Sequence, residues 1–213
     1  RKLGEAIAEA GQEEEKFRLA MGNLEDEMAS IGFPSSSHNA GIGGAPFDLI
    51  SDRLRGMKGS MIDMYRRPDK LIAACEKILE WRLERAVKAD PKKRGNPKIA
   101  ASALHRGSHG FMSKKQFETF YWPGLKKSIQ AAIDTGFVAN PFAEGVYTDR
   151  LEYFLEFAKG TVCVRLSETD MARAKAVLGG HCCIMGNVPA SLLQVGEPSE
   201  VEEYCKNLIK VCG

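Results

Sequence analysis

The chain has 213 residues, of which 44% are hydrophobic and 27% are charged, and its formal net charge at pH 7 is +2. A chain of this length can bury a sizeable core, and its 30 basic and 28 acidic residues are interspersed, which argues against a basic surface for nucleic acid. No apolar run reaches the roughly 18 residues of a membrane span. The beginning, RKLGEAIAEAGQEEE, is too acidic for a signal peptide, so we expect a cytoplasmic protein.

The six cysteines have no CxxC spacing and stand in apolar or helical surroundings. They are at positions 75, 163, 182, 183, 205 and 212. This pattern predicts reduced, mostly buried thiols and not a disulfide framework.

The first third of the chain is predicted to be mainly helical. Apolar residues at steps of three and four predict a helix over residues 1–31, which Gly32 and Pro34 end. We expect a loop over 34–39 and then a short strand over 40–50 that leads into a helix near Asp48. Pro68 is predicted to begin the next helix.

From residue 90 onward, strand and helix signals alternate. After a loop at 91–97, apolar segments predict strands over 99–105, 137–142, 161–166 and 181–185. Ser113 with Gln116, and Ser199 with Glu202, have the spacing of a capping box and predict helix starts. Further helices are expected around residues 151–159 and over 170–178. The alternation indicates parallel βα units, which both a doubly wound sheet and a TIM barrel contain.

Polar side chains follow each predicted strand. They are His105, Arg106 and His109 after the first strand, Glu144 after the second, Arg165, Ser167 and Glu168 at the end of the third, and Asn187 after the fourth. In a barrel these residues would meet at one mouth. Histidine can act there as a general acid or base, and arginine can bind a carboxylate through two hydrogen bonds.

Each of these residues also has a purely structural interpretation, which the sequence leaves open. His105 or His109 could be a hydrogen-bonded loop residue, and Arg165 could form an ion pair with Glu168. Three other polar residues, Asp149, Asp170 and Ser199, are interpreted as helix caps.

Five segments resemble the uroporphyrinogen decarboxylase superfamily, which includes corrinoid-dependent methyltransferases. These segments are APFDLISDRLRGMKGSMIDMYRRPDKL, HRGSHGFMSKKQFETFYWPGLKK, EGVYTDRLEYFLEFAKG, GNVPASLLQVG and EPSEVEEYCKNLI. Their order and spacing, more than any one motif, carry the resemblance. It implies an α/β fold of the TIM (β/α)8 barrel type.

The resemblance also implies that the barrel is incomplete. A (β/α)8 barrel typically needs roughly 250 residues, and this chain has about five candidate βα units. We therefore expect a single partial domain over 1–213, with a helical lead-in at 1–39 and βα units over 40–213, and interpret the chain as an internal fragment that lacks both ends.

Family positions carry over to this sequence one at a time. The tyrosine that contacts the tetrapyrrole in decarboxylases aligns with Asp52, and a family serine aligns with Gly107 or Ser108. The zinc-binding His-x-Cys-Gly of the methyltransferases aligns with residues 142–145, Phe-Ala-Glu-Gly. Zinc is therefore not expected. Cys182 and Cys183 do not replace these ligands, because neighbouring strand residues point to opposite faces.

The expected function is that of a family enzyme acting on a tetrapyrrole or a corrinoid-linked, methylated substrate. We predict catalytic roles for His105, Glu144 and Asp52, substrate binding by Arg106, His109, Arg165, Glu168 and Asn187, and no bound metal. Decarboxylation without a cofactor, or zinc-independent methyl transfer or demethylation, fits better than zinc- and corrinoid-dependent methyl transfer, although a corrinoid protein remains a candidate partner. The alternative is a non-catalytic incomplete barrel, whose exposed sheet edges would favour a homodimer or aggregation. On either view we expect the fragment alone to be inactive.

Overall fold

The computed structural model describes residues 2–33, 37–38, 40–86, 88 and 97–213, and it contains one parallel sheet with the strand order β1-β2-β3-β4-β5. The strands are β1 (Ser37–His38), β2 (Ile99–Leu104), β3 (Val138–Ala143), β4 (Cys163–Leu166) and β5 (Cys183–Met185). Every neighbouring pair is parallel. The predicted strands after residue 98 are thereby confirmed, with ends shifted by one or two residues.

Helical segments connect the strands. The α-helices are α1 (Lys2–Ser30), α2 (Pro46–Leu49), α3 (Met57–Arg66), α4 (Pro68–Leu83), α5 (Lys114–Gln116), α6 (Trp122–Asp134), α7 (Met171–Leu178), α8 (Ala190–Val195) and α9 (Pro198–Cys212). Two short π-helices, η1 (Ile50–Leu54) and η2 (Phe117–Tyr121), and one 3-10 helix, η3 (Leu151–Glu156), are the other helical segments among the described residues. Pro68 at the first position of α4 and the capping box of Ser113 and Gln116 confirm two predicted helix starts.

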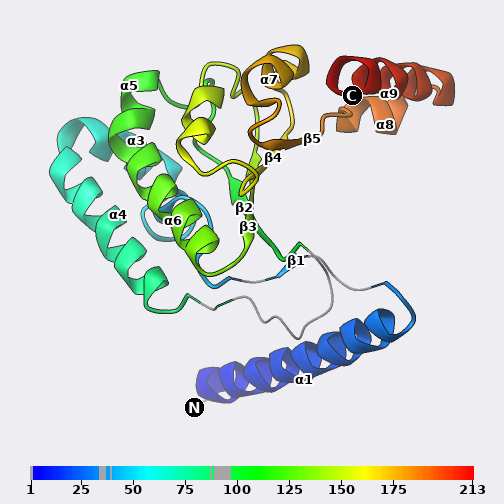
Figure 1. Ribbon diagram of the computed structural model, residues 1–213. Coiled ribbons are helices and arrows are strands. Elements are labelled where there is room, and N and C mark those ends of the chain that lie inside the picture. Colours follow the sequence, from blue (N-terminus) through cyan, green and yellow to red (C-terminus); the bar gives the residue numbers. More distant parts are fainter. Residues whose placement is uncertain (1, 34–36, 39, 87, 89–96) are drawn as a thin grey trace.

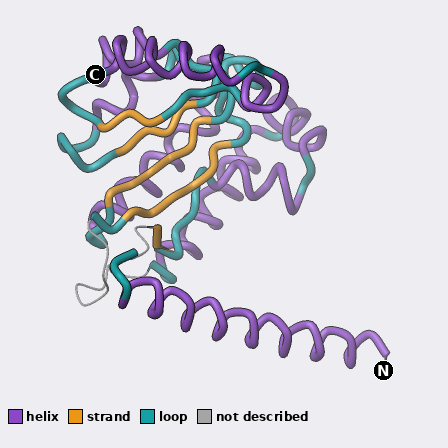
Figure 2. The backbone as a smooth tube through the Cα atoms, turned by 90° about the vertical axis from the view of Figure 1, so that its right-hand side faces the viewer, coloured by secondary structure: helices purple, strands orange, loops and turns teal. Residues whose placement is uncertain are grey.

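The helices cover one face of the sheet and leave the other face open. Figure 1 shows α4, α6 and α7 on the same side of β2 to β5, and in Figure 2 the strands face the viewer with helices behind them. The side chains of β4 alternate between the two faces accordingly. Val164 and Leu166 are buried in the core, while Arg165, between them, is exposed. Within the described residues, the core therefore lies between the sheet and one helical layer.

Large aromatic side chains fill the centre of this core. Phe117 stacks on Tyr121 with ring centroids 5.5 Å apart, and Trp122 meets Phe154 edge to face at 5.9 Å. All four are buried. Pairs of this kind stabilise beyond their buried area by about 0.5–1.5 kcal/mol each, and the second pair joins α6 to η3.

The strand order separates the two architectures that the alternation left open. In a doubly wound sheet the order reverses at a switch point, whereas here each strand lies beside the one that precedes it. Consecutive parallel strands with helices on one face are the arrangement of a (β/α)8 barrel. Over the described strands the sheet is open, with β1 and β5 at its edges.

Helix α1 is confirmed, but its apolar stripe is uncovered. Its members include Phe17, which is 67% exposed, and Leu24, which is 47% exposed, and no residue of the helix is buried. The periodicity therefore indicated the helix correctly without indicating a partner for it. In the described part of the chain, no helix is both long and apolar enough to cross a membrane.

Several local predictions were wrong. The strand expected over 40–50 is absent, since residues 40–45 are irregular and lead directly into α2. Within the loop expected at 34–39, residues 37–38 instead pair with β2, while 34–36 and 39 lie outside the described residues, as does most of the 91–97 loop. The last helix is capped by Glu197 and Glu200, because Pro198 already occupies its first turn, so Ser199 and Glu202 form no capping box.

Candidate functional site

The strand register brings the predicted polar residues into one row. Leu104 pairs with Ala143, and Ala143 with Leu166, across β2, β3 and β4. The residues that follow these three are His105, Glu144 and Ser167, so they begin the carboxyl edge of the sheet at one level. Neighbouring strands lie about 4.8 Å apart. The predicted convergence at one mouth therefore has a geometric basis.

Asp52 joins the two basic residues that follow β2. Its Oδ2 lies 2.5 Å from Nδ1 of His105, and its Oδ1 accepts a hydrogen bond of 2.8 Å from Nη2 of Arg106. The π-helix η1 presents Asp52 to them, and the hydroxyl of Ser51 donates to the same carboxylate at 3.2 Å. Residues more than 50 positions apart in the chain are thus assembled into one acid–base group.

The charges of this group reinforce one another. The hydrogen bond that His105 donates to Asp52 raises the pKa of His105, opposed by burial and supported by the nearby carboxylates of Asp48 and Glu144. Burial works against ionisation of Asp52, but the hydrogen bond and charge of His105 and the charge of Arg106 hold its pKa below the ordinary value. Nδ1 of His105 is thus held by Asp52, and Nε2 is left to act on a ligand.

Asp48 lies beneath this group and holds its backbone. Its carboxylate is 6% exposed and accepts hydrogen bonds from the backbone N–H of His105 (3.1 Å) and of Arg106 (3.0 Å), and from the hydroxyl of Tyr121 (2.6 Å). Burial raises the pKa of Asp48 to about 6, although all three hydrogen bonds oppose this shift. Sequence analysis missed Asp48 as a site residue. The sequence signal that could have identified Asp48 is an acidic residue between apolar neighbours, within Pro46–Leu49.

A groove at the carboxyl ends of β4 and β5 contains further predicted residues. It has a volume of about 740 Å³, and its lining includes Arg165, Glu168 and Asn187. The guanidinium of Arg165 lies 4.4 Å from the ring centroid of Phe142 and does not form the alternative ion pair with Glu168 among the described contacts. A cation stacked on an aromatic ring keeps its outer donors available to an anion.

The remaining predicted residues have partners inside the fold. The amide of Asn187 donates to the carbonyl of Thr169 at 2.9 Å and accepts from the hydroxyl of Tyr204 at 3.0 Å, which ties the end of β5 to α9. His109 hydrogen bonds to Asp149 at 3.0 Å, away from Asp52. Their binding roles stay predictions.

Of the three predicted helix caps, one is confirmed. Asp170 accepts from the backbone N–H of Arg173 at the start of α7. Asp149 caps no helix, since Arg150 occupies the cap position of η3 without a side-chain bond, and Ser199 lies inside α9.

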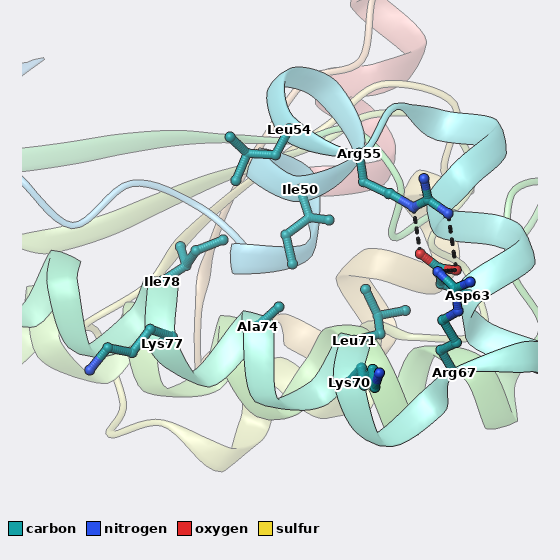
Figure 3. Close-up of a pocket in the computed structure, with 10 residues that line it drawn as sticks. All are labelled: Ile50, Leu54, Arg55, Asp63, Arg67, Lys70, Leu71, Ala74, Lys77 and Ile78. Atoms are coloured by element: carbon teal, nitrogen blue, oxygen red, sulfur yellow. Dashed lines mark hydrogen bonds and ion pairs between the residues drawn. The ribbon is translucent and has the colours of Figure 1, made fainter.

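A second pocket, of about 560 Å³, lies among the helices (Figure 3). Its floor is formed by apolar side chains of η1 and α4, and its carboxylate, Asp63, is ion-paired with Arg55 at 2.6 Å. The lining contains no histidine or cysteine. Since its acid is already neutralised by a cation, we place the chemistry at the strand ends.

Gly107 fixes the loop that carries His105 and Arg106, and we expect Gly107→Ala to destabilise the protein by about 1–3 kcal/mol. A methyl group here would clash with the hydroxyl of Tyr147 and lie 2.6 Å from the ring of Tyr121. Urea denaturation measures the loss. Gly110→Ala, in the same loop but with open space around it, is the matched control and should leave stability nearly unchanged. Equal stability of the two variants would contradict this packing.

The comparisons with known proteins agree with the architecture. The family model described as uroporphyrinogen decarboxylase (URO-D) matches residues 33–213. No curated protein matches the chain. The matched range begins just after α1 and includes every strand of the sheet and every residue of the site.

Proposed function

The chain belongs to the uroporphyrinogen decarboxylase family, and from this premise we propose that it binds a carboxylate-bearing tetrapyrrole, or a corrinoid-linked substrate, at the carboxyl ends of its strands. The reaction we favour is cofactor-free decarboxylation, with zinc-independent methyl transfer or demethylation as its close alternative. One observation carries the proposal: the carboxylate of Asp52 binds both His105 and Arg106 at the edge of the sheet. We further propose that the sheet is part of a (β/α)8 barrel.

Arg165 and His105 would have different roles, substrate binding and proton donation. Arg165, stacked on Phe142 in the groove, would bind a substrate carboxylate through charge-assisted hydrogen bonds. His105 would supply a proton from Nε2, since its Nδ1 is held by Asp52. In decarboxylation the bond between the side-chain carbon and its carboxylate breaks, carbon dioxide leaves, and the electron pair left on carbon takes up the proton. The imidazole then regains a proton from water.

Zinc-dependent methyl transfer is supported less well. The histidine and cysteine positions of the zinc motif align with Phe142, whose ring is covered by Arg165, and with Glu144. Phe142 has no donor atom, and among the described residues no group of three or more His, Cys, Asp or Glu side chains could hold a metal ion with Glu144. Because these residues do not fit a zinc ion, no step of the proposed reaction passes through one.

A non-catalytic role is the second candidate, and the open face of the sheet favours it. In the described part of the chain this face carries exposed apolar groups, such as Met185, which is 45% exposed. A family domain that binds a ligand or a second copy without turnover could use such a face. It would not need the pair of His105 and Asp52.

Ligand titration tests the proposed substrate class. Coproporphyrin and hydroxocobalamin are each titrated into the 213-residue protein and followed by absorbance, and we expect one of them to bind about tenfold more weakly to Arg165→Ala, because a charge-assisted hydrogen bond is lost. Arg106→Ala should weaken the same ligand. Lys127→Ala removes an exposed cation from α6, on the helical side, and is the control.

Each outcome of the titration discriminates between the candidates. Porphyrin binding that depends on Arg165 supports the decarboxylase branch, whereas corrinoid binding with the same dependence supports methyl transfer. If neither ligand binds, or if Lys127→Ala weakens binding as much as Arg165→Ala, the proposed site is wrong and the non-catalytic role is preferred.

A further inference from the structure

Two cysteines face each other on the open side of the sheet. Cys163 of β4 and Cys183 of β5 are register partners, and both are free thiols. Partners in neighbouring parallel strands lie about 4.8 Å apart and point to the same face. Burial first, and then the adjacent thiol of Cys183, raise the pKa of Cys163 to about 12. The two sulfur atoms are therefore neighbours, although 20 residues separate them in the chain.

The face that these thiols occupy follows from strand alternation. Val164, next to Cys163, is part of the hydrophobic core, while Cys163 is 6% exposed and does not belong to that core. Just before β5, Cys182 is buried and its thiol contacts the carbonyl of Phe154, while Cys183, the first residue of the strand, is exposed. One thiol is thus open to a ligand, the second lies behind it, and Cys182 is excluded from the pair.

A third soft donor stands on the same face. Met185 is two residues after Cys183, so its thioether points the same way, and it is 45% exposed. Its register partner is Arg165. Two thiols and a thioether therefore occupy one patch of the sheet, formed by neighbouring positions of two strands.

We propose that Cys163, Cys183 and Met185 form a binding site for a soft monovalent cation, Cu(I). Thiolate and thioether ligands select Cu(I) over harder ions. Among the described residues no group of three or more His, Cys, Asp or Glu side chains could hold a metal ion, so the donor set does not suit zinc, which takes four ligands of that kind. Both thiols are free in this structure, so they are available to a metal ion.

The binding step balances in atoms and charge. Two neutral thiols and one Cu(I) give a bis-thiolate complex of net charge −1, and two protons pass to the solvent. No oxidant or reductant takes part. Because protons are released, binding should tighten as the pH rises.

Competition with a chromophoric Cu(I) chelator tests the site. Under anaerobic conditions, Cu(I) bound to bicinchoninate is titrated with the intact protein, and we expect one ion per chain to be withdrawn from the chelator. Cys183→Ser, at an exposed position, should weaken binding more than about 100-fold, because loss of a direct ligand exceeds the 10–100-fold effect of losing a supporting group. Met185→Leu should have a smaller effect.

Cys182→Ser is the matched control, since it removes the adjacent thiol on the opposite face. If Cys182→Ser loses Cu(I), or if Cys183→Ser retains it, the proposed site is wrong. A second measurement needs no variant: bound Cu(I) should protect Cys163 and Cys183, but not Cys205, from alkylation. Protection spread over all cysteines would equally overturn the proposal. Neither result depends on the tetrapyrrole or corrinoid function.

Discussion

Asp48→Ala should lower the free energy of unfolding by on the order of 3 kcal/mol at pH 7, since each buried donor left without a partner costs about 1–3 kcal/mol. Three donors lose their acceptor: the backbone N–H groups of His105 and Arg106 and the hydroxyl of Tyr121. The last of these is fully buried, and water cannot replace the carboxylate there without opening the core. Urea denaturation followed by circular dichroism measures the change.

The control is Asp134, an aspartate on the surface of the protein and not in its interior. Asp134 is exposed at the end of α6, where it accepts one hydrogen bond from Gln130. Asp134→Ala should therefore alter stability by less than about 0.5 kcal/mol. A loss at Asp48 as small as the loss at Asp134 would show that the buried carboxylate does not hold the loop.

The destabilisation caused by Asp48→Ala should decrease as the pH rises from about 4 to about 6. Because burial raises the pKa of Asp48 to about 6 in the folded chain, the folded state keeps a proton that the unfolded state releases near pH 4. Between these values the folded state binds more protons, so the contribution of Asp48 to the free energy of unfolding falls as the pH rises. The difference between the native protein and Asp48→Ala should shrink by on the order of 2 kcal/mol between about pH 4 and pH 6.

Much of this fold could be predicted because its elements carry local signals. β2 and β4 are apolar runs between turn residues, and Ser113 with Gln116 marks a helix start by chemistry alone. The row of polar residues after the strands was also predictable, because parallel strands end at one edge. Signals of this kind need only a few neighbouring residues.

What could not be predicted depends on contacts between distant segments. Asp48 meets His105 across 57 positions, and Cys163 meets Cys183 through strand register, which the sequence does not specify. The apolar character of residues 40–45 led to the wrong prediction of a strand. Glycines at 41 and 43 have positive φ, and this backbone conformation keeps the segment irregular. Propensity indicates what a segment can form, and only tertiary contacts decide between the options.

Asp52→Asn should lower the pKa of His105 toward its ordinary value. Asparagine can still accept the hydrogen bond from Nδ1, so the substitution removes the charge and keeps the geometry of the 2.5 Å contact. NMR titration of the histidine rings measures the shift. In the native protein the pKa of His105 is raised, so the pair stabilises the fold below about pH 6.5 and loses this contribution as the pH rises through the folded-state pKa.

The matched control is Asp149→Asn, which makes the same change beside His109 and should leave the titration of His105 in place. If both variants shift His105 equally, Asp52 is not its specific partner.

The same pair should dominate the proposed chemistry. Since the 213 residues alone are expected to be inactive, the two substitutions are made in an active protein that contains them. If His105 supplies the proton, His105→Ala lowers decarboxylation of uroporphyrinogen there by about 10²–10⁴-fold, and Asp52→Asn shifts the alkaline limb of the pH–rate profile to lower pH. A purely structural role for the pair would reduce activity and stability together at every pH. An unchanged profile in Asp52→Asn would therefore assign the proton to another group, and Glu144, the next residue in the row at the sheet edge, would be the first to test.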